Sequence, residues 1–355
     1  MRYWLLIFAV LLGACAPAYA QTPVATPVPV PTVVPAGTPP PQIRKFQDGP
    51  VVCYYAATGW GSLFCIDIRI GDEMTARAGA KARLGPGRNL GGITPPVPSV
   101  SGQPMPTTPP EGWTRIFEED FDVPAAVGQF RSIYGSKFAN YNDGWPTTGA
   151  PANVRRCSSK VVSVESGRMV YTQHAETLAA DDPCREGSTN PTWLNAVEQP
   201  IPNDGIMGKS NARWTIRFRV VAETAALEGQ YLVPLLWPVT EAWPADGEID
   251  FPEGGLSGNM VGFSHHQGAT EPGDQTQVNT GVPFTPGWHT ATTEWIGGTS
   301  VKLYLDGALV GEVTERVPNK AMRYVLQTET CWGGPCPPEG SSVRIEWDWV
   351  VGETQ

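Results

Sequence analysis

Three carboxylates lie within six residues in the stretch Glu248-Ile-Asp250-Phe-Pro-Glu253. On a β-strand the side chains of residues i and i+2 share a face, so Glu248 and Asp250 point the same way. Glu253 has the other parity and joins them only if the strand carries a one-residue bulge. The Phe251-Pro252 pair is a place where a bulge is tolerated. We therefore expect a bulged strand that gathers all three acids on one face.

Crowded acids are unfavourable without a purpose, because like charges disfavour joint ionisation. Hydrolysis of a glycosidic bond uses such a pair, since a retaining enzyme needs a carboxylate nucleophile and a protonated acid about 5–5.5 Å apart. Glu248 and Glu253 fit these two roles, and Asp250 between them would hydrogen-bond the nucleophile and separate the two pKa values. The alternative is a solvated row of acids on an exposed strand face.

The chain after residue 112 carries the alternation of apolar and polar residues that is typical of β-strands. The clearest segments are residues 213–221, 288–298, 300–313 and 342–352. Within the third segment, Asp306-Gly307 is a hairpin turn signal. With 39 Gly, 36 Pro and no long amphipathic helix, the sequence predicts an all-β fold, a β-sandwich or jelly roll.

This part of the chain resembles glycoside hydrolase family 16, the laminarinase-like jelly-roll hydrolases, over most of residues 112–352. The resemblance rests on the core around the three acids and on residues 113–122, 236–237, 243–244, 288–290, 294–295, 304–307 and 344–350. It implies a concanavalin-like jelly roll in which Glu248 is the nucleophile, Glu253 the acid/base and Asp250 the assisting residue. The bulged spacing resembles the laminarinase branch and not the unbulged lichenase branch.

Together these features predict a retaining endo-acting glycosidase that cleaves a β-linked polysaccharide, with β-1,3-glucan as the leading substrate. Two alternatives remain open. Departures from the family pattern at Gly254-Gly255 and in residues 325–336 favour the same mechanism on a galactan or a mixed-linkage glucan. A non-catalytic carbohydrate-binding sandwich is the other alternative, because fold does not fix function.

Sugar rings stack their apolar faces on indole rings, so tryptophans near the acids are candidates for binding substrate. We expect Trp237, Trp243 and Trp332 to do so, with core packing as the alternative for each. We also expect His266, which follows the acids along the chain, to donate a hydrogen bond to a substrate hydroxyl.

The predicted hydrolysis requires no cofactor. The resemblance does imply a structural calcium ion on the convex face, with Glu119 and Asp348 among its ligands. Carboxylate oxygens are the ligands that such hard cations prefer. Acids on an ordinary protein surface are the alternative for this pair.

The N-terminus predicts export. Residues 1–20 combine Arg2, a short apolar run and Ala18-Tyr19-Ala20, the features of a secretory signal peptide. Leu12-Gly-Ala-Cys15 resembles a bacterial lipobox, which would place a lipid on Cys15. The protein is then either secreted or anchored to an extracytoplasmic surface, and this anchor is the one membrane contact that the sequence predicts.

Six cysteines remain beyond Cys15, an even number that suggests disulfides in an exported chain. Proximity in the sequence favours the pairs Cys53–Cys65, Cys157–Cys184 and Cys331–Cys336, although other connectivities are open.

The expected modules are a proline-rich linker at 21–42, a disulfide-closed hairpin at 43–70, a connector with a second proline-rich linker at 71–111, and a catalytic domain at 112–355. The formal net charge of −10 argues against a nucleic-acid binder, which would need a basic surface. The expected partner is the polysaccharide substrate that the three acids and the resemblance imply.

Overall fold

The computed structural model describes three strands between residues 43 and 67, and residues 99–355 apart from 148, 225–226 and 333. The expected signal peptide, the lipobox at Cys15, the linker at 21–42 and most of the connector at 71–111 lie outside the described residues. The chain divides into two compact units, residues 1–80 and 81–355.

In the first unit, an antiparallel sheet has the order β1-β2-β3, formed by Ile43–Asp48, Val51–Ala56 and Phe64–Asp67. The register places Cys53 of β2 opposite Cys65 of β3. The expected disulfide between them stays a prediction, because their side chains lie outside the described part of the structure.

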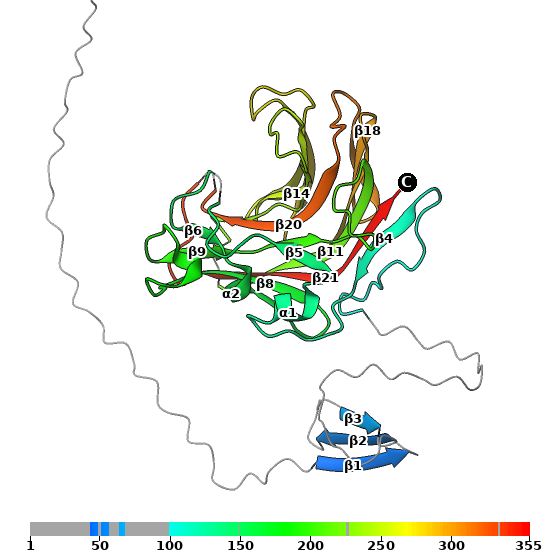
Figure 1. The fold of residues 1–355 in the computed structure, drawn as a ribbon, viewed down its shortest axis with the longest axis vertical. Helices are drawn as coiled ribbons and strands as arrows, with labels where there is room; N and C mark the ends of the chain where they lie inside the picture. Colours follow the sequence, from blue (N-terminus) through cyan, green and yellow to red (C-terminus); the bar gives the residue numbers. More distant parts are fainter. Residues whose placement is uncertain are drawn as a thin grey trace, which may run out of the picture. The chain divides into compact units, whose positions relative to one another are not determined.

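The second unit is built from two sheets packed face to face. In Figure 1, β20 of one sheet lies over β11 and β21 of the other. The eight-stranded sheet has the order β16-β15-β14-β12-β20-β10-β5, and β13 pairs with both β14 and β20. Its strands are β5 (Phe138–Asn140), β10 (Val197–Pro200), β12 (Gln230–Leu232), β13 (Leu235–Pro238), β14 (Glu248–Gly255), β15 (Asn259–His265), β16 (Gln275–Pro283) and β20 (Met322–Thr330).

The ten-stranded sheet has the order β19-β18-β17-β11-β21-β8-β9-β6, with β4 on β21 and β7 on β8. Its strands are β4 (Thr114–Glu119), β6 (Val154–Arg156), β7 (Val162–Val164), β8 (Met169–Glu176), β9 (Thr192–Asn195), β11 (Asn211–Ala222), β17 (Trp288–Ile296), β18 (Ser300–Leu305), β19 (Ala308–Val313) and β21 (Ser342–Thr354). The helical elements are short: α1 (Phe130–Tyr134), α2 (Ser158–Val161) and the 3-10 turn η1 (Pro183–Arg185).

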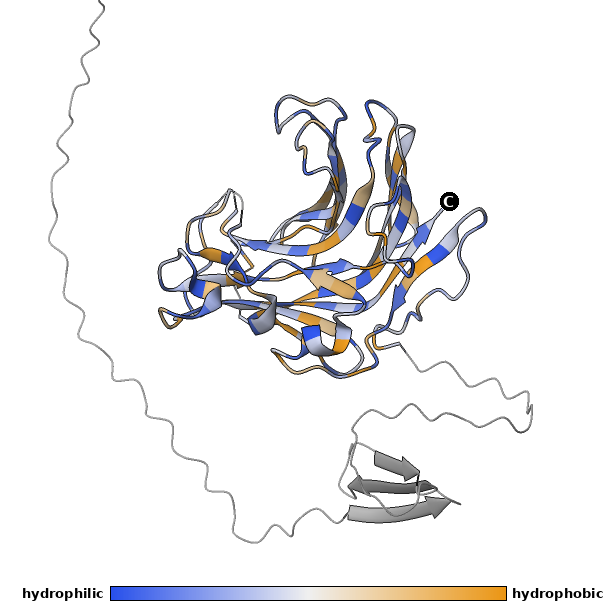
Figure 2. Cartoon of the chain, in the orientation of Figure 1, coloured by the Kyte–Doolittle hydropathy of each residue, from blue (hydrophilic) through white to orange (hydrophobic). Residues whose placement is uncertain are grey.

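Alternation along each strand decides which side chains enter the core between the sheets. On β20, Tyr324 and Leu326 are buried in that core, whereas Val325 belongs to a separate apolar cluster on the opposite face. Tyr324 stacks on Trp214 of β11, with ring centroids 4.7 Å apart and planes at 6°, so one aromatic pair joins the two sheets. Figure 2 shows the alternation as hydrophobic and hydrophilic bands along the strands. The predicted all-β jelly-roll fold is confirmed.

The four segments predicted from alternation all form strands, which are β11, β17, the β18–β19 hairpin and β21. The turn between β18 and β19 lies at Asp306-Gly307, with φ of 50° and 85°. Two successive positive φ values are what a two-residue hairpin turn of the primed type needs, and glycine supplies the second without steric penalty. The Asp-Gly turn signal is therefore confirmed.

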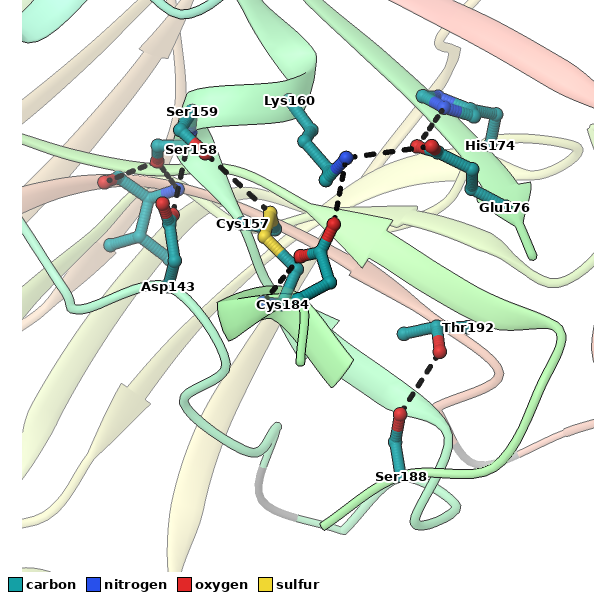
Figure 3. Close-up of a disulfide and its surroundings, with 12 residues drawn as sticks. Asp143, Cys157, Ser158, Ser159, Lys160, His174, Glu176, Cys184, Ser188 and Thr192 are labelled. Carbon is teal, nitrogen blue, oxygen red and sulfur yellow. Dashed lines mark hydrogen bonds and ion pairs between the residues drawn. A yellow bond between two sulfur atoms is a disulfide. The ribbon is translucent and has the colours of Figure 1, made fainter. Parts of the chain in front are cut away.

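Two of the three expected disulfides are formed, Cys157–Cys184 and Cys331–Cys336. Cys157 precedes α2 and Cys184 lies in η1, so the first bridge joins two short elements that flank β6 and β9 (Figure 3). Beside it, Lys160 Nζ lies 3.4 Å from Glu176 Oε1 (Figure 3). The same Nζ lies 3.1 Å from Asp182 Oδ2. The second bridge closes a short loop directly after β20.

Residues 99–111, which we expect to be the end of the connector, lie along the outer face of β21. Ser99 Oγ donates to Asp348 Oδ2 at 2.5 Å, and Trp349 Nε1 donates to the carbonyl of Gln103 at 2.9 Å. The expected domain boundary at residue 112 stays a prediction. Among the described residues, no helix combines the length and apolar character needed to cross a membrane.

Candidate functional site

The strand that carries the three acids contains the predicted bulge. In the β14–β15 ladder, Asp250 pairs with Phe263 and Glu253 pairs with Val261, so three steps along β14 face two steps along β15. Ile249 is buried in the core between the sheets. Its neighbours Glu248 and Asp250 therefore point to the other face of the sheet, and the bulge turns Glu253 to that same face.

The three carboxylates are buried, although they face away from the main core. Glu248, Asp250 and Glu253 are 7%, 3% and 7% exposed. The alternative of a solvated row of acids on an exposed strand is therefore wrong. Carboxylates at such depth need partners or protons, because burial disfavours their charged form.

His265 at the end of β15 lies directly opposite Glu248 in the ladder. Its Nε2 is 3.3 Å from Asp250 Oδ2 and 3.9 Å from Glu248 Oε2. Its Nδ1 lies 3.0 Å from the carbonyl oxygen of Pro272, which can only accept a hydrogen bond. Nδ1 therefore carries a proton, which leaves Nε2 to share a proton with the two carboxylates.

Glu253 has a different partner. The hydroxyl of Tyr231, on β12, donates to Glu253 Oε1 at 2.7 Å. β12 lies between β14 and β20, and Tyr231 pairs with Gly255 on one side and Glu329 on the other. Glu329 is itself buried and forms an ion pair with Arg156.

Burial raises the pKa of all three acids, and repulsion by a neighbouring carboxylate adds to each rise. Burial raises the pKa of Glu253 to about 7, with the Tyr231 hydrogen bond and His265 opposing the rise. The pKa of Glu248 lies well above its usual range, first through burial and then through Asp250. Burial and Glu253 raise the pKa of Asp250 in the same way. The cluster therefore holds protons at neutral pH, the condition under which one carboxyl can act as an acid and another as a base.

Aromatic rings flank the acids at both ends of the cluster. Trp237 of β13 stacks near Trp243, with ring centroids 6.3 Å apart and planes at 18°, and Trp243 meets His265 edge to face at 6.0 Å. At the other end, Trp332 lies 5.2 Å from Tyr231 and is 46% exposed. Trp243 therefore lies next to His265, Trp237 lies next to Trp243, and Trp332 lies next to Tyr231, the partner of Glu253.

His266 does not join this cluster, so the expected role of this histidine needs correction. Its Nδ1 is 2.7 Å from Asp274 Oδ1 and its Nε2 is 2.9 Å from the hydroxyl of Thr276. Both ring nitrogens are thus engaged by the protein itself. Neighbouring side chains on a strand point to opposite faces, and here it is His265 that points to the acids.

Glu119 and Asp348, the expected calcium ligands, each have protein partners. Glu119 Oε2 is 2.5 Å from Lys137 Nζ, and its Oε1 accepts a hydrogen bond from the backbone of Phe121. Asp348 Oδ2 accepts from Ser99. The groups of described residues with metal-binding spacing do not include either acid. The two carboxylates do not form a donor set in this arrangement, and a calcium ion on this face stays a prediction from the resemblance.

Glu248, Asp250 and His265 do have metal-binding spacing, since their ligand atoms all lie within 4.8 Å of one another. The same spacing suits proton sharing between His265 and the two carboxylates. A cavity of about 740 Å³ lies on the ten-stranded sheet and is lined by residues that include Arg213, Trp288 and Glu353. The acids in its lining are all paired: Glu353 lies 2.8 Å and Glu294 3.4 Å from Arg213, and Asp306 lies 2.9 Å from His289.

Known structures share this arrangement of sheets. SCLam, a non-specific endo-β-1,3(4)-glucanase from family GH16, matches 71% of this chain and 95% of its own at 17% identity and a TM-score of 0.55. The laminarinase catalytic domain of Thermotoga maritima matches 68% of this chain and 98% of its own, at 18% identity and a TM-score of 0.54. An endo-acting O-glycanase of the human gut microbiota matches 70% of this chain and 94% of its own, at 18% identity and a TM-score of 0.53.

This is the fold of glycoside hydrolase family 16. No protein-family profile matches the sequence, and no curated protein matches it either. The likeness is therefore one of architecture, carried by the jelly-roll sheets and not by overall sequence identity.

Within the family 16 fold, two site residues were missing from the sequence prediction. The sequence favours His266, whereas the register of the β14–β15 hairpin places its neighbour His265 opposite Glu248. Tyr231 lies on a separate strand and carries no motif that marks it. Its position opposite Gly255 follows from strand pairing, which local sequence does not reveal.

Proposed function

We propose that this protein is a retaining endo-acting glycoside hydrolase that cleaves a β-linked polysaccharide, with β-1,3-glucan as its substrate. The observation that carries the proposal is the buried acid face of β14. There the bulge brings Glu253 to the side of Glu248 and Asp250, and its pKa rises to about 7. A purely structural sheet face has no use for three buried, mutually repelling carboxylates.

In this mechanism Glu253 protonates the oxygen of the leaving sugar while Glu248 attacks the anomeric carbon. A glycosyl-enzyme ester forms on Glu248 as the glycosidic bond breaks. Glu253, now ionised, takes a proton from water, which attacks the same carbon and releases Glu248. A pKa near 7 suits a group that must first give and then take a proton.

Glu248 must be ionised to attack, although its own pKa is raised. A hydrogen bond between the two side chains raises the pKa of Glu248 and lowers that of Asp250, so the shared proton rests on Glu248 in the free protein. In the reactive state this proton moves across the hydrogen bond to Asp250, which then donates to the ionised Glu248. His265, 3.3 Å from Asp250, assists because its positive charge lowers the pKa of Glu248.

The flanking aromatic rings supply binding surface for the polymer. Trp237 and Trp243 would stack on sugar rings at the His265 end, and Trp332 at the Glu253 end. Stacking sites on both sides of the acids suit an enzyme that cuts within a chain, because sugars are bound on each side of the scissile bond.

Another polymer, such as a mixed-linkage glucan or a galactan, is the second candidate. Gly255 favours it, because a Cβ at this position would meet nothing within 4 Å. This open space lies opposite Tyr231, next to the acid end of the cluster. A substrate with a different bend or substituent could be accommodated there.

The test is reducing-end release by the full chain on laminarin, lichenan, agarose and carrageenan. Activity on laminarin that is lost in Glu248→Gln supports the proposal, and activity on another polymer alone moves the substrate to the second candidate. Glu312→Gln, the same chemical change at an exposed site on β19 of the other sheet, is the matched control. Binding without release of reducing ends on any β-glycan would instead support a carbohydrate-binding sandwich.

We also propose that the chain is exported, either cleaved after Ala20 or lipidated at Cys15. The two disulfides of the second unit support this proposal, because such bridges persist in oxidising compartments. Cell fractionation with metabolic labelling by a fatty acid tests the choice. Label that is lost in Cys15→Ala supports anchoring, and unlabelled protein in the medium supports secretion.

A further inference from the structure

Tyr231 connects the acid end of the site with the disulfide-closed loop at residues 331–336. Its hydroxyl donates to Glu253 Oε1 at 2.7 Å, and its ring lies 5.2 Å from Trp332. Among the described residues, this hydroxyl is the one hydrogen-bond partner of the Glu253 side chain. Burial and Glu253 raise the pKa of Tyr231 above its usual value, so the hydroxyl remains a donor at every working pH.

The loop is fixed directly against the strand that carries Tyr231. The backbone N–H of Cys331 donates to the carbonyl of Gly229 at 2.9 Å, just before β12 begins. A Cβ on Gly229 would lie 2.5 Å from the carbonyl oxygen of Pro335, so loop and strand pack too closely for any side chain there. The Cys331–Cys336 bridge closes this loop and holds Trp332 over the Tyr231 ring.

Charged groups face Glu253 from three other directions. His265 on β15 favours its ionised form, and Glu329 on β20 disfavours it. Glu329 is partly neutralised by Arg156 and accepts a hydrogen bond from Gln327 at 2.8 Å. On β14 itself, Asp250 and Glu248 lie on the same face. Tyr231 is thus a neutral donor among these charges, and it contacts only one of the two carboxylate oxygens of Glu253.

That asymmetry determines which oxygen carries the proton. An oxygen that accepts from a phenol is the less basic of the two, so the proton of the neutral acid resides on Oε2. We propose that Tyr231 is a positioning residue that orients the transferable proton of Glu253 on Oε2, and that Trp332 and its disulfide-closed loop hold Tyr231 in place. The inference rests on the proposed hydrolase function and names a residue pair that controls its acid/base.

Tyr231→Phe tests the inference, because it removes the hydroxyl and keeps the ring against Trp332. Losing a donor that favours the ionised carboxylate raises the pKa of Glu253, so the alkaline limb of kcat/KM against pH moves up by about half a unit or more. On polysaccharide, kcat/KM falls about tenfold, with most of the loss in kcat. Tyr304→Phe, on β18 of the other sheet, is the matched control and changes neither quantity.

Two further readouts separate positioning from a structural effect. An aryl β-glycoside with a dinitrophenolate leaving group needs little proton donation, so Tyr231→Phe lowers its kcat/KM by less than about twofold. Trp332→Leu moves the alkaline limb in the same direction as Tyr231→Phe. Equal losses on both substrates with an unmoved limb would overturn the role of Tyr231. If Trp332→Leu raises KM and leaves the alkaline limb unchanged, Trp332 only stacks on substrate, and its proposed role in holding Tyr231 is overturned.

The ionisation of Glu253 can also be followed without any substrate. In the carboxyl carbon NMR spectrum, the Glu253 signal is identified by its loss in Glu253→Gln, and its titration is compared between wild type and Tyr231→Phe. An upward shift supports the inference even if the true polymer is unknown, and an unchanged midpoint contradicts it. An inactive wild type would count against the proposed function and leave this comparison intact.

Discussion

His265 Nε2 lies 3.3 Å from Oδ2 of Asp250 and thereby joins the end of β15 to the middle acid of β14. The histidine is also opposite Glu248 in the ladder, and it hydrogen-bonds through Nδ1 to the loop at Pro272. The hydrogen bond through Nδ1 therefore holds the ring in place while Nε2 faces the acids. From this position His265 lowers the pKa of both Glu248 and Glu253.

We predict that His265→Gln moves the whole pH optimum upward. A protonated His265 lowers the pKa of Glu248 and of Glu253, so its removal raises both. The acidic limb depends on ionised Glu248 and the alkaline limb on protonated Glu253, and both limbs then shift in the same direction. The profile of kcat/KM from pH 4 to pH 9 measures this. His266→Gln is the matched control, and a His265→Gln profile that overlays the wild type would contradict the prediction.

Glu248→Gln should abolish turnover without weakening the fold. Loss of the nucleophile lowers kcat by about a thousandfold or more. The unfolding temperature should stay constant or rise, because a neutral amide replaces a buried acid that repels Asp250. Activity assays and thermal unfolding of the same preparation check both parts. A variant that unfolds several degrees earlier would mean that Glu248 is a structural residue.

The raised pKa of Glu253 predicts a specific dependence of stability on pH. The folded-state pKa is about 7 against an ordinary value of 4.5, so between these values the folded protein holds a proton that the unfolded chain has lost. The folded form binds more protons there, and the stability contribution of Glu253 falls as pH rises from about 4.5 to about 7. The full effect is about 3 kcal/mol.

Glu253→Gln removes this titration and keeps an oxygen that can accept from Tyr231. The variant should gain stability over the wild type as pH rises, with little difference near pH 4 and the full difference at pH 8. Urea unfolding midpoints at the two pH values measure it. A constant difference between the variant and the wild type would show that Glu253 titrates normally.

Removing either of the two disulfides should lower stability and activity, but by different amounts for each bridge. Cys157 and Cys184 are 27 residues apart, so losing their bridge by double Ser substitution lowers stability by about 3.5 kcal/mol in the loop-entropy relation. Cys331 and Cys336 are five residues apart, for which the same relation gives about 2 kcal/mol. The second variant should lose more activity than the first, because its loop holds Trp332 over Tyr231. Equal losses of activity would contradict this division.

Much of the strand layout follows from local sequence. Segments such as residues 342–352 alternate between apolar and polar side chains, and one face must be buried, so the strand and its orientation are determined together. The bulge at Phe251-Pro252 was also predictable, because only a bulge brings Glu253 to the face of the other two acids and because a strand tolerates proline mainly at edges and bulges. The bulge, in turn, placed all three acids on one face before any partner strand was known.

Partners of the acids across the sheet could not be found in this way. Whether His265 or His266 faces Glu248 depends on the length of the β14–β15 hairpin and on the bulge within it, and a shift of one residue would exchange them. Tyr231 reaches Glu253 because β12 is inserted between β14 and β20, strands far apart in the chain.

The sequence by itself determined the all-β class and the acid face of β14, because both depend on the parity of residues along a strand. It favoured the two disulfides seen in the second unit and left other pairings open. Tertiary structure decided the burial of the acids, the choice of His265 and the position of Tyr231 between Glu253 and Trp332. These features depend on which strands pair and on how far neighbouring side chains bury the acids of β14. Both arise from long-range packing that local residue patterns do not encode.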